Sequence, residues 1–254
     1  MKNTFKRGII TLLPLLVLLV IWQAVVRDNA RYDFIMGSPA GIWRELCALA
    51  AQQTLGRDFG VTLLETLLGF AAGSIIGTAA GLILWGSAKL FRIVRPYLVA
   101  LGALPAFALA PVLIFWVGTG ILSKVLLGFL STFVVAVVQA HTGASEADTN
   151  LIKLTRAFGG TKQQVFFKII VPSAAIWVVA GVRLNVGMAL LGAFVGELIS
   201  SRMGLGHLIV VAEGLYNVNQ IWVGVLGFMG IATIFHWCIL PVEHRVNRWK
   251  PKTE

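Results

Sequence analysis

Six long apolar runs, separated by polar segments, constrain the fold of this chain more than any other feature. A run of about 20 apolar residues forms a helix that can cross the ~30 Å hydrocarbon core of a bilayer. Backbone polar groups must be satisfied internally within lipid, so such runs predict transmembrane helices. We therefore expect an all-α, polytopic membrane protein with a single transmembrane domain over residues 1–254. Its six spans are predicted at residues 9–26, 59–85, 96–117, 123–140, 173–199 and 221–240.

The overall composition agrees with a membrane protein. Of the 254 residues, 57% are hydrophobic and 13% are charged, which is too apolar for a soluble domain of this size. The net charge of +10 could indicate a nucleic-acid-binding protein. However, the cations cluster between the apolar runs, where they act as topology signals. Of the two cysteines, Cys238 lies inside the last apolar run, so we expect no disulfide with Cys47.

The distribution of lysine and arginine predicts the orientation of the chain. With the N-terminus in the cytoplasm, about fourteen cations fall in inner segments and about six in outer segments. Both termini and the polar segment 146–172 are therefore expected on the cytoplasmic side. A cleaved signal peptide is the alternative for the first run. That run is long for such a peptide and no clear A-x-A site follows it, so we predict a retained helix.

The longest polar interruption after the first spans, residues 146–172, carries the pattern of two short helices around a glycine turn. Asp148 can cap the first helix, and Gly159 permits the positive φ of a sharp reversal. Val165, Phe166 and Ile169 then give the second helix apolar surface. Apolar side chains that face water require a partner protein. The alternative is that they pack this segment against the rest of the chain.

This segment resembles the cytoplasmic coupling loop of permease subunits of ABC importers. The family pattern is E-A-A, three residues, Gly, nine residues and then I-x-L-P. Gly159, Ile169 and Pro172 stand at the family spacing, with Val171 in place of leucine. The E-A-A triplet is replaced by Lys-Leu-Thr at 153–155. The resemblance implies that Gly159 is the hinge of the loop and that Val165, Phe166 and Ile169 contact an ATPase.

The similarity continues over most of the chain and is closest to the nitrate, taurine and aliphatic-sulfonate branch of these permeases. Many relatives in that branch carry arginine where Glu65 and Gly102 stand. The anionic substrates of that branch therefore cannot simply be assigned to this chain. The supporting stretches are residues 38–39, 68–70, 104–105, 108–111, 115–118, 123–124, 181–184, 197, 204–206, 208–209 and 248–251.

The resemblance implies a type I ABC importer permease fold (MetI-like) in the bacterial cytoplasmic (inner) membrane. It also implies a homodimer that works with cytoplasmic ABC ATPase subunits and an extracytoplasmic solute-binding protein. The implied substrate is a small anion or organic solute of the nitrate, sulfonate or taurine type. The chain has no G-x-x-x-x-G-K-[ST] phosphate loop. We therefore expect no enzymatic activity, cofactor or nucleic-acid partner for this subunit, and ATP to be used by the ATPase.

Charged and proline residues inside the spans are candidates for a translocation path or gate, since an intramembrane charge is costly unless it is paired or faces water. Glu65 and Arg183 lie at compatible depths in two spans, so they either pair or each face the path. Glu197 is too far from Arg183 to pair with it, and is expected at an outer gate or a solvated helix end. Pro105 and Pro111 predict a kinked or partly unwound third span.

Two further patterns concern the spacing of glycines and of histidines. Four glycines spaced by four residues, from Gly69 to Gly81, draw a smooth stripe for close helix packing. The four histidines have no metal-ligand spacing.

An ion-coupled secondary carrier or intramembrane enzyme that uses Glu65, Arg183 and Glu197 is the alternative function. The lack of a visible internal repeat weakens the carrier hypothesis.

Overall fold

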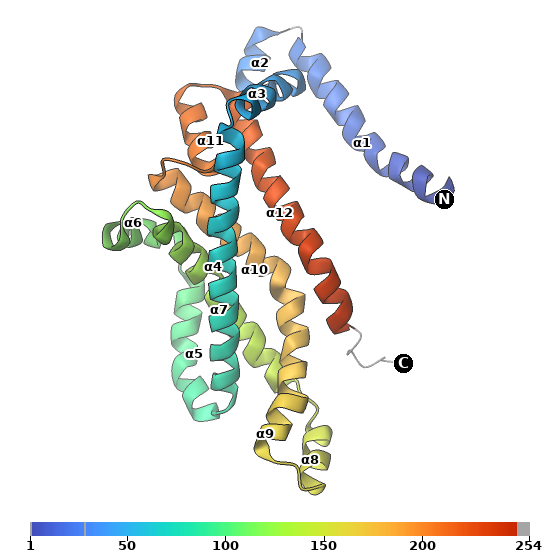
Figure 1. Ribbon diagram of the computed structural model, residues 1–254, viewed down its shortest axis with the longest axis vertical. Coiled ribbons are helices and arrows are strands. Elements are labelled where there is room, and N and C mark those ends of the chain that lie inside the picture. The colour runs from blue at the N-terminus through green and yellow to red at the C-terminus, as the bar shows by residue number, and fades with distance from the viewer. Residues whose placement is uncertain (1, 28, 248–254) are drawn as a thin grey trace.

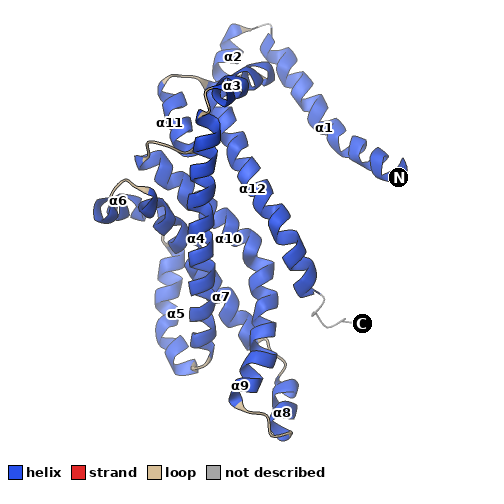
Figure 2. Ribbon diagram, in the orientation of Figure 1, coloured by secondary structure: helices blue, strands red, loops and turns tan. Residues whose placement is uncertain are grey.

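The computed structural model describes residues 2–27 and 29–247, and every regular element in that part of the chain is a helix (Figure 2). The expected ending at 248–251 lies outside the described residues. The elements are α1 (Lys2–Arg27), α2 (Ala30–Met36), α3 (Pro39–Ala51), α4 (Thr54–Trp85), α5 (Ala88–Ala103), α6 (Ala106–Val117), α7 (Ile121–Ser145), α8 (Thr149–Ala157), α9 (Lys162–Val165), the π-helical turn η1 (Phe166–Ile170), α10 (Val171–Ser200), α11 (Leu205–Gly214) and α12 (Val218–Asn247).

Within the described residues, four helices are long and apolar enough to cross a membrane. They are α4, α7, the continuous helix Lys162–Ser200 and α12. The first predicted span falls within α1, which packs on α2 and α3 and otherwise extends away from the bundle (Figure 1). In Figure 1 the segment with α8 and α9 projects at one end of the long axis, and α2, α3 and α11 gather at the other.

The third predicted span is two helices rather than one. Together α5 and α6 form a fifth candidate span that is bent by 99°. Leu104 and Pro105 are both extended, with ψ of 125° and 120°, because proline disfavours the helical conformation of the preceding residue. The predicted kink is therefore present. The helix before it begins at Ala88, so that Lys89, Arg92 and Arg95 lie in its first turns.

The glycine stripe of α4 is a packing surface for α7. All four glycines are buried, and a Cβ on Gly77 would lie 2.8 Å from the Cβ of Ala136. A Cβ on Gly73 would collide with the hydroxyl of Thr132 and lie 2.8 Å from the carbonyl oxygen of Phe129. The two backbones can approach this closely only because small residues face each other, as expected in a bilayer.

Two alanine substitutions in α4 are therefore expected to have opposite effects on stability. Gly73→Ala should lower the free energy of unfolding by about 1–3 kcal/mol, because α4 and α7 must separate. A Cβ added at Gly60 meets no atom within 4 Å. Gly60→Ala should therefore raise the free energy of unfolding by about 0.5–1 kcal/mol through helix propensity. Thermal unfolding of the purified variants in detergent measures both. Equal effects of the two substitutions would contradict the packing assigned to the stripe.

Candidate functional site

The segment 146–172, which we call the knob, is built by local capping interactions. The Asp148 carboxylate accepts a hydrogen bond from the backbone N–H of Asn150 at 2.8 Å and begins α8. Gly159 has φ of +77°, and the backbone N–H of Gly160 donates to the Thr155 carbonyl at 2.9 Å. This closes the C-terminus of α8 with a left-handed glycine. Thr161 then begins α9 with a reciprocal capping box to Gln164.

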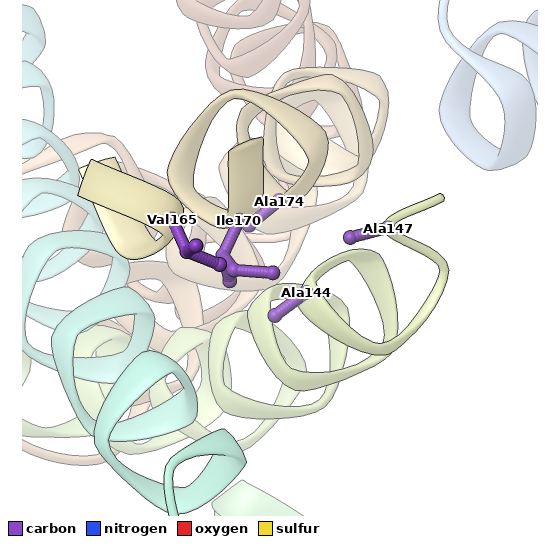
Figure 3. Close-up of a cluster of buried hydrophobic side chains, with 5 residues drawn as sticks. All are labelled: Ala144, Ala147, Val165, Ile170 and Ala174. Atoms are coloured by element: carbon purple, nitrogen blue, oxygen red, sulfur yellow. The ribbon is translucent and has the colours of Figure 1, made fainter. Parts of the chain in front are cut away.

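The apolar residues predicted to contact an ATPase instead hold the knob against the membrane helices. Val165 is 3% exposed and lies in a buried cluster with Ile170 and the alanines 144, 147 and 174 (Figure 3). Phe166 and Ile169 are half-buried against the same cluster. The prediction that Val165 fills a groove on a partner is therefore wrong. Val165 packs the knob onto the rest of the chain, as the alternative states, and contact of the half-buried Phe166 and Ile169 with an ATPase stays a prediction.

The second knob helix runs without interruption into the membrane. Residues Lys162–Ser200 form one helix, with Pro172 in the first turn after η1. Proline has no N–H to donate, and a π-helical turn, in which the N–H of Val171 donates to Phe166, accommodates it. The second helix of the knob and α10 are therefore one continuous element.

A different set of apolar side chains on the knob faces outward. Phe158 and Phe167 are 84% and 66% exposed, and Leu151 and Leu154 are about half exposed. We call these four residues the knob surface. Leu151, Leu154 and Phe158 recur at helical spacing, which is the signal that could have identified them. An exposed apolar group flanked by cations is suited to docking a protein.

A second polar site lies near the other end of the bundle and joins α4, α10 and α11. The Glu197 carboxylate accepts hydrogen bonds from the Thr62 hydroxyl and from the backbone N–H of Gly206, both at 2.6 Å. The Thr62 hydroxyl in turn accepts from the N–H of Leu205 at 2.9 Å, and Asp58 accepts from the N–H of Gly204 at 3.1 Å. Two carboxylates and a hydroxyl therefore satisfy the free N–H groups at the start of α11.

Glu197 is 1% exposed, so it is not a solvated helix end. It fixes the N-terminus of α11 to the C-terminal part of α10. The stretch of glycines at 204–206 allows this approach: a Cβ on Gly206 would lie 2.7 Å from the Cβ of Glu197. Within the described residues, no group of three or more His, Cys, Asp or Glu side chains could hold a metal ion.

Lys124 completes this cluster, which we define as Asp58, Thr62, Glu65, Lys124 and Glu197 and call the outer polar cluster after the side of the membrane expected for it from the distribution of charge. The Lys124 ammonium group is almost fully buried and donates to the backbone carbonyls of Thr119, Gly120 and Ser200. It therefore ties the end of α10 to the turn before α7. No local sequence pattern around Lys124 indicated this structural role.

Glu65 lies in the same cluster, where Glu197 and Lys124 are its charged neighbours. The side chain is 1% exposed, and its Oε2 atom has no hydrogen-bond partner among the described residues. The hypothesis that Glu65 pairs with Arg183 is wrong. Arg183 instead pairs with Glu243 of α12 at 2.7 Å. Arg183 therefore does not join Glu65 and Glu197 in one catalytic or ion-coupling site.

The bend between α5 and α6 borders a cavity of about 400 Å³. Non-helical backbone at membrane depth is tolerated where it is buried in protein or lines a cavity. Leu104 and Pro105 are in its wall, together with residues of α7 and α10. The predicted path residue Pro105 thus lies beside a cavity, whereas Pro111 lies inside α6.

Residues 69–248 match the family described as the inner membrane component of binding-protein-dependent transport systems. The chain belongs to this family. It is a permease subunit of an ABC importer and has no ATPase activity of its own.

Two relatives and one solved structure illustrate the match. The chain is 32% identical to the riboflavin transport system permease protein RibX of Chloroflexus aurantiacus, over 93% of this chain and 88% of the relative. It is 26% identical to the putative aliphatic sulfonates transport permease protein SsuC of Bacillus subtilis, over 94% and 86%. The inward-facing methionine ABC transporter MetNI aligns over 78% of this chain and 98% of its own, with 19% identity and a TM-score of 0.68.

These matches confirm the fold class expected for the permease and its resemblance to the nitrate, taurine and aliphatic-sulfonate branch. The family description also states that transport depends on a binding protein. The permease fold therefore carries the knob at one end of the bundle and the outer polar cluster toward the other.

Proposed function

We propose that this permease forms the translocation path as one of two identical copies and that a cytoplasmic ATPase drives it through the knob surface. The observation that carries the proposal is the exposure of Phe158 and Phe167 in the knob. The helices α8 and α9 of the knob project at one end of the bundle (Figure 1). ATP-driven closure of the ATPase would move the knob. Because the second knob helix is continuous with α10, that motion would reach the outer polar cluster.

The orientation follows from charge. The knob carries Lys153, Arg156, Lys162 and Lys168, and cytoplasmic segments of membrane proteins are enriched in such residues. The knob and both termini are therefore proposed to be cytoplasmic, in a bacterial inner membrane. A solute-binding protein would then deliver substrate at the opposite face, near α2, α3 and α11.

The substrate is proposed to be a small organic solute. The names of the two relatives indicate two chemical classes, since SsuC is named for anionic aliphatic sulfonates and RibX for riboflavin, a heterocycle without a net charge. The nitrate, sulfonate and taurine class expected from the sequence is thus one of two possibilities that relatives of similar identity suggest.

Removal of one aromatic ring from the knob surface tests the coupling. Phe158→Ser is expected to insert and fold normally, because the side chain is 84% exposed, but to lose the ATPase during purification from native membranes. Tyr216→Ser removes an aromatic ring that is 74% exposed on another part of the chain and is the matched control. The ATPase to permease ratio by quantitative mass spectrometry is the measurement. An unchanged ratio in Phe158→Ser, or no ATPase with the native protein, would remove the basis of the proposal.

A further inference from the structure

The cavity beside the α5–α6 bend carries information on the substrate. We propose that this cavity binds an uncharged, aromatic solute, and that such solutes rather than anions are the class this permease transports. The inference rests on the proposed function for its physiological meaning. Binding at the cavity, however, is a property of this chain alone and can be measured without the ATPase.

The cavity wall consists of apolar groups with one side-chain hydroxyl. Among the described lining residues, none is charged, and Ser131 carries the single polar side chain. The Ser131 hydroxyl donates to the Leu127 carbonyl at 2.8 Å, which leaves its lone pairs to accept a hydrogen bond from a solute. The volume of about 400 Å³ falls in the range of small-molecule sites.

Two aromatic rings in the wall favour a flat ligand. Phe129 and Phe133 both line the cavity, and their rings are stacked with centroids 5.3 Å apart. Aromatic groups prefer such offset or edge contacts with other rings, worth about 0.5–1.5 kcal/mol beyond the area that they bury. A saturated sulfonate has no ring to stack on these side chains, and the apolar wall offers no partner for its charged group.

Three cations of the helices that line the cavity are engaged or located elsewhere. Lys124 donates to three backbone carbonyls, and Arg183 pairs with Glu243. Arg95 lines an adjoining hollow and not this cavity. An anion in the cavity would therefore lose its hydration without gaining a counter-charge, which costs several kcal/mol per ion even after relaxation of the protein, as a rough figure. An uncharged ring system avoids this cost.

A matched pair of probes isolates the effect of charge. 1-Naphthol and 1-naphthalenesulfonate share a ring system and differ in charge at neutral pH. Equilibrium dialysis against the purified full chain in lipid nanodiscs, with empty nanodiscs subtracted, gives the saturable binding of each. We expect naphthol to bind at least about tenfold more tightly than the sulfonate, a difference of about 1.4 kcal/mol or more.

A charge added to the wall should reverse this preference. Gly102→Arg places a cation in the cavity wall and should weaken naphthol binding and strengthen binding of the sulfonate. Gly214→Arg is the control, because the space around Gly214 is open and it does not line the cavity. Equal or tighter binding of the sulfonate by the native chain, no saturable binding of naphthol, or the same response to both arginines would overturn the proposal.

These outcomes are separate from those that test the proposed function. If the ATPase copurifies but the cavity prefers the anion, the proposed coupling to an ATPase is supported and the proposed substrate class is contradicted. If naphthol binds with the expected preference but no ATPase copurifies, the cavity site stands and the coupling proposal falls.

Discussion

Replacement of Gly159 by proline is expected to abolish transport and substrate-stimulated ATP hydrolysis, although the protein still inserts in the membrane. Gly159 has φ of +77°, which proline cannot adopt because its ring fixes φ near about −65°. Proline also removes the N–H that Gly159 donates to the Arg156 carbonyl at 3.0 Å. The turn between α8 and α9 would therefore open, and the knob surface would lose its shape. Transport in reconstituted vesicles, measured with the native binding protein and ATPase, checks this result.

The matched control for this position is Gly159→Asn. Asparagine tolerates the left-handed conformation better than other residues with a side chain, and a Cβ at this position would meet no atom within 4 Å. Transport by Gly159→Asn should therefore stay within a few-fold of the native rate. Normal transport by Gly159→Pro would show that the glycine turn is not needed for coupling.

Removal of the Glu197 side chain is expected to destabilise the permease by about 3–5 kcal/mol. Glu197→Ala leaves the Gly206 N–H and the Thr62 hydroxyl without their acceptor and withdraws a negative charge from the neighbourhood of the buried Lys124. The start of α11 would then detach from α10. Reversible unfolding in mixed detergent micelles, followed by circular dichroism, measures the loss.

Two further variants make this prediction specific. Glu213→Ala removes an exposed glutamate from α11 and should change stability by no more than about 0.5 kcal/mol. Glu197→Gln keeps an acceptor oxygen and should fall between the other two. If Glu197→Ala were as stable as Glu213→Ala, the outer polar cluster would have no structural role.

The elements that depend on local sequence could be predicted. Four of the six apolar runs lie in helices that are long and apolar enough to cross a membrane, because length and composition decide whether a helix can cross lipid. The four-residue glycine period gave the close packing face of α4. Gly159 gave the turn of the knob, because only a residue that tolerates positive φ fits there.

Features that depend on tertiary contacts could not be predicted. Pairing of Glu65 with Arg183 was one of two interpretations of their similar depth, but depth along a helix does not fix the direction in which a side chain points. Arg183 points toward Glu243, and the Lys124 ammonium group donates to three backbone carbonyls that come from two separate parts of the chain. Val165 was expected outside because a short helix has too few residues to reveal which face is buried.

The bend of the third span was predicted only in part. Pro105 marked the break, because proline disfavours the helical conformation of the residue before it. The angle of 99° and the cavity beside it depend on how α6 folds back on α7 and α10, which no local pattern encodes.

Sidedness of the knob is the most direct test of the central claim that it receives force from a cytoplasmic ATPase. The free cysteines Cys47 and Cys238 are first replaced by serine, and a single cysteine is introduced as Phe158→Cys or, for comparison, Tyr216→Cys. With a membrane-impermeant maleimide, Phe158→Cys should be labelled in inverted inner-membrane vesicles and not in spheroplasts, and Tyr216→Cys should show the reverse. Labelling of Phe158→Cys in intact spheroplasts would contradict the account.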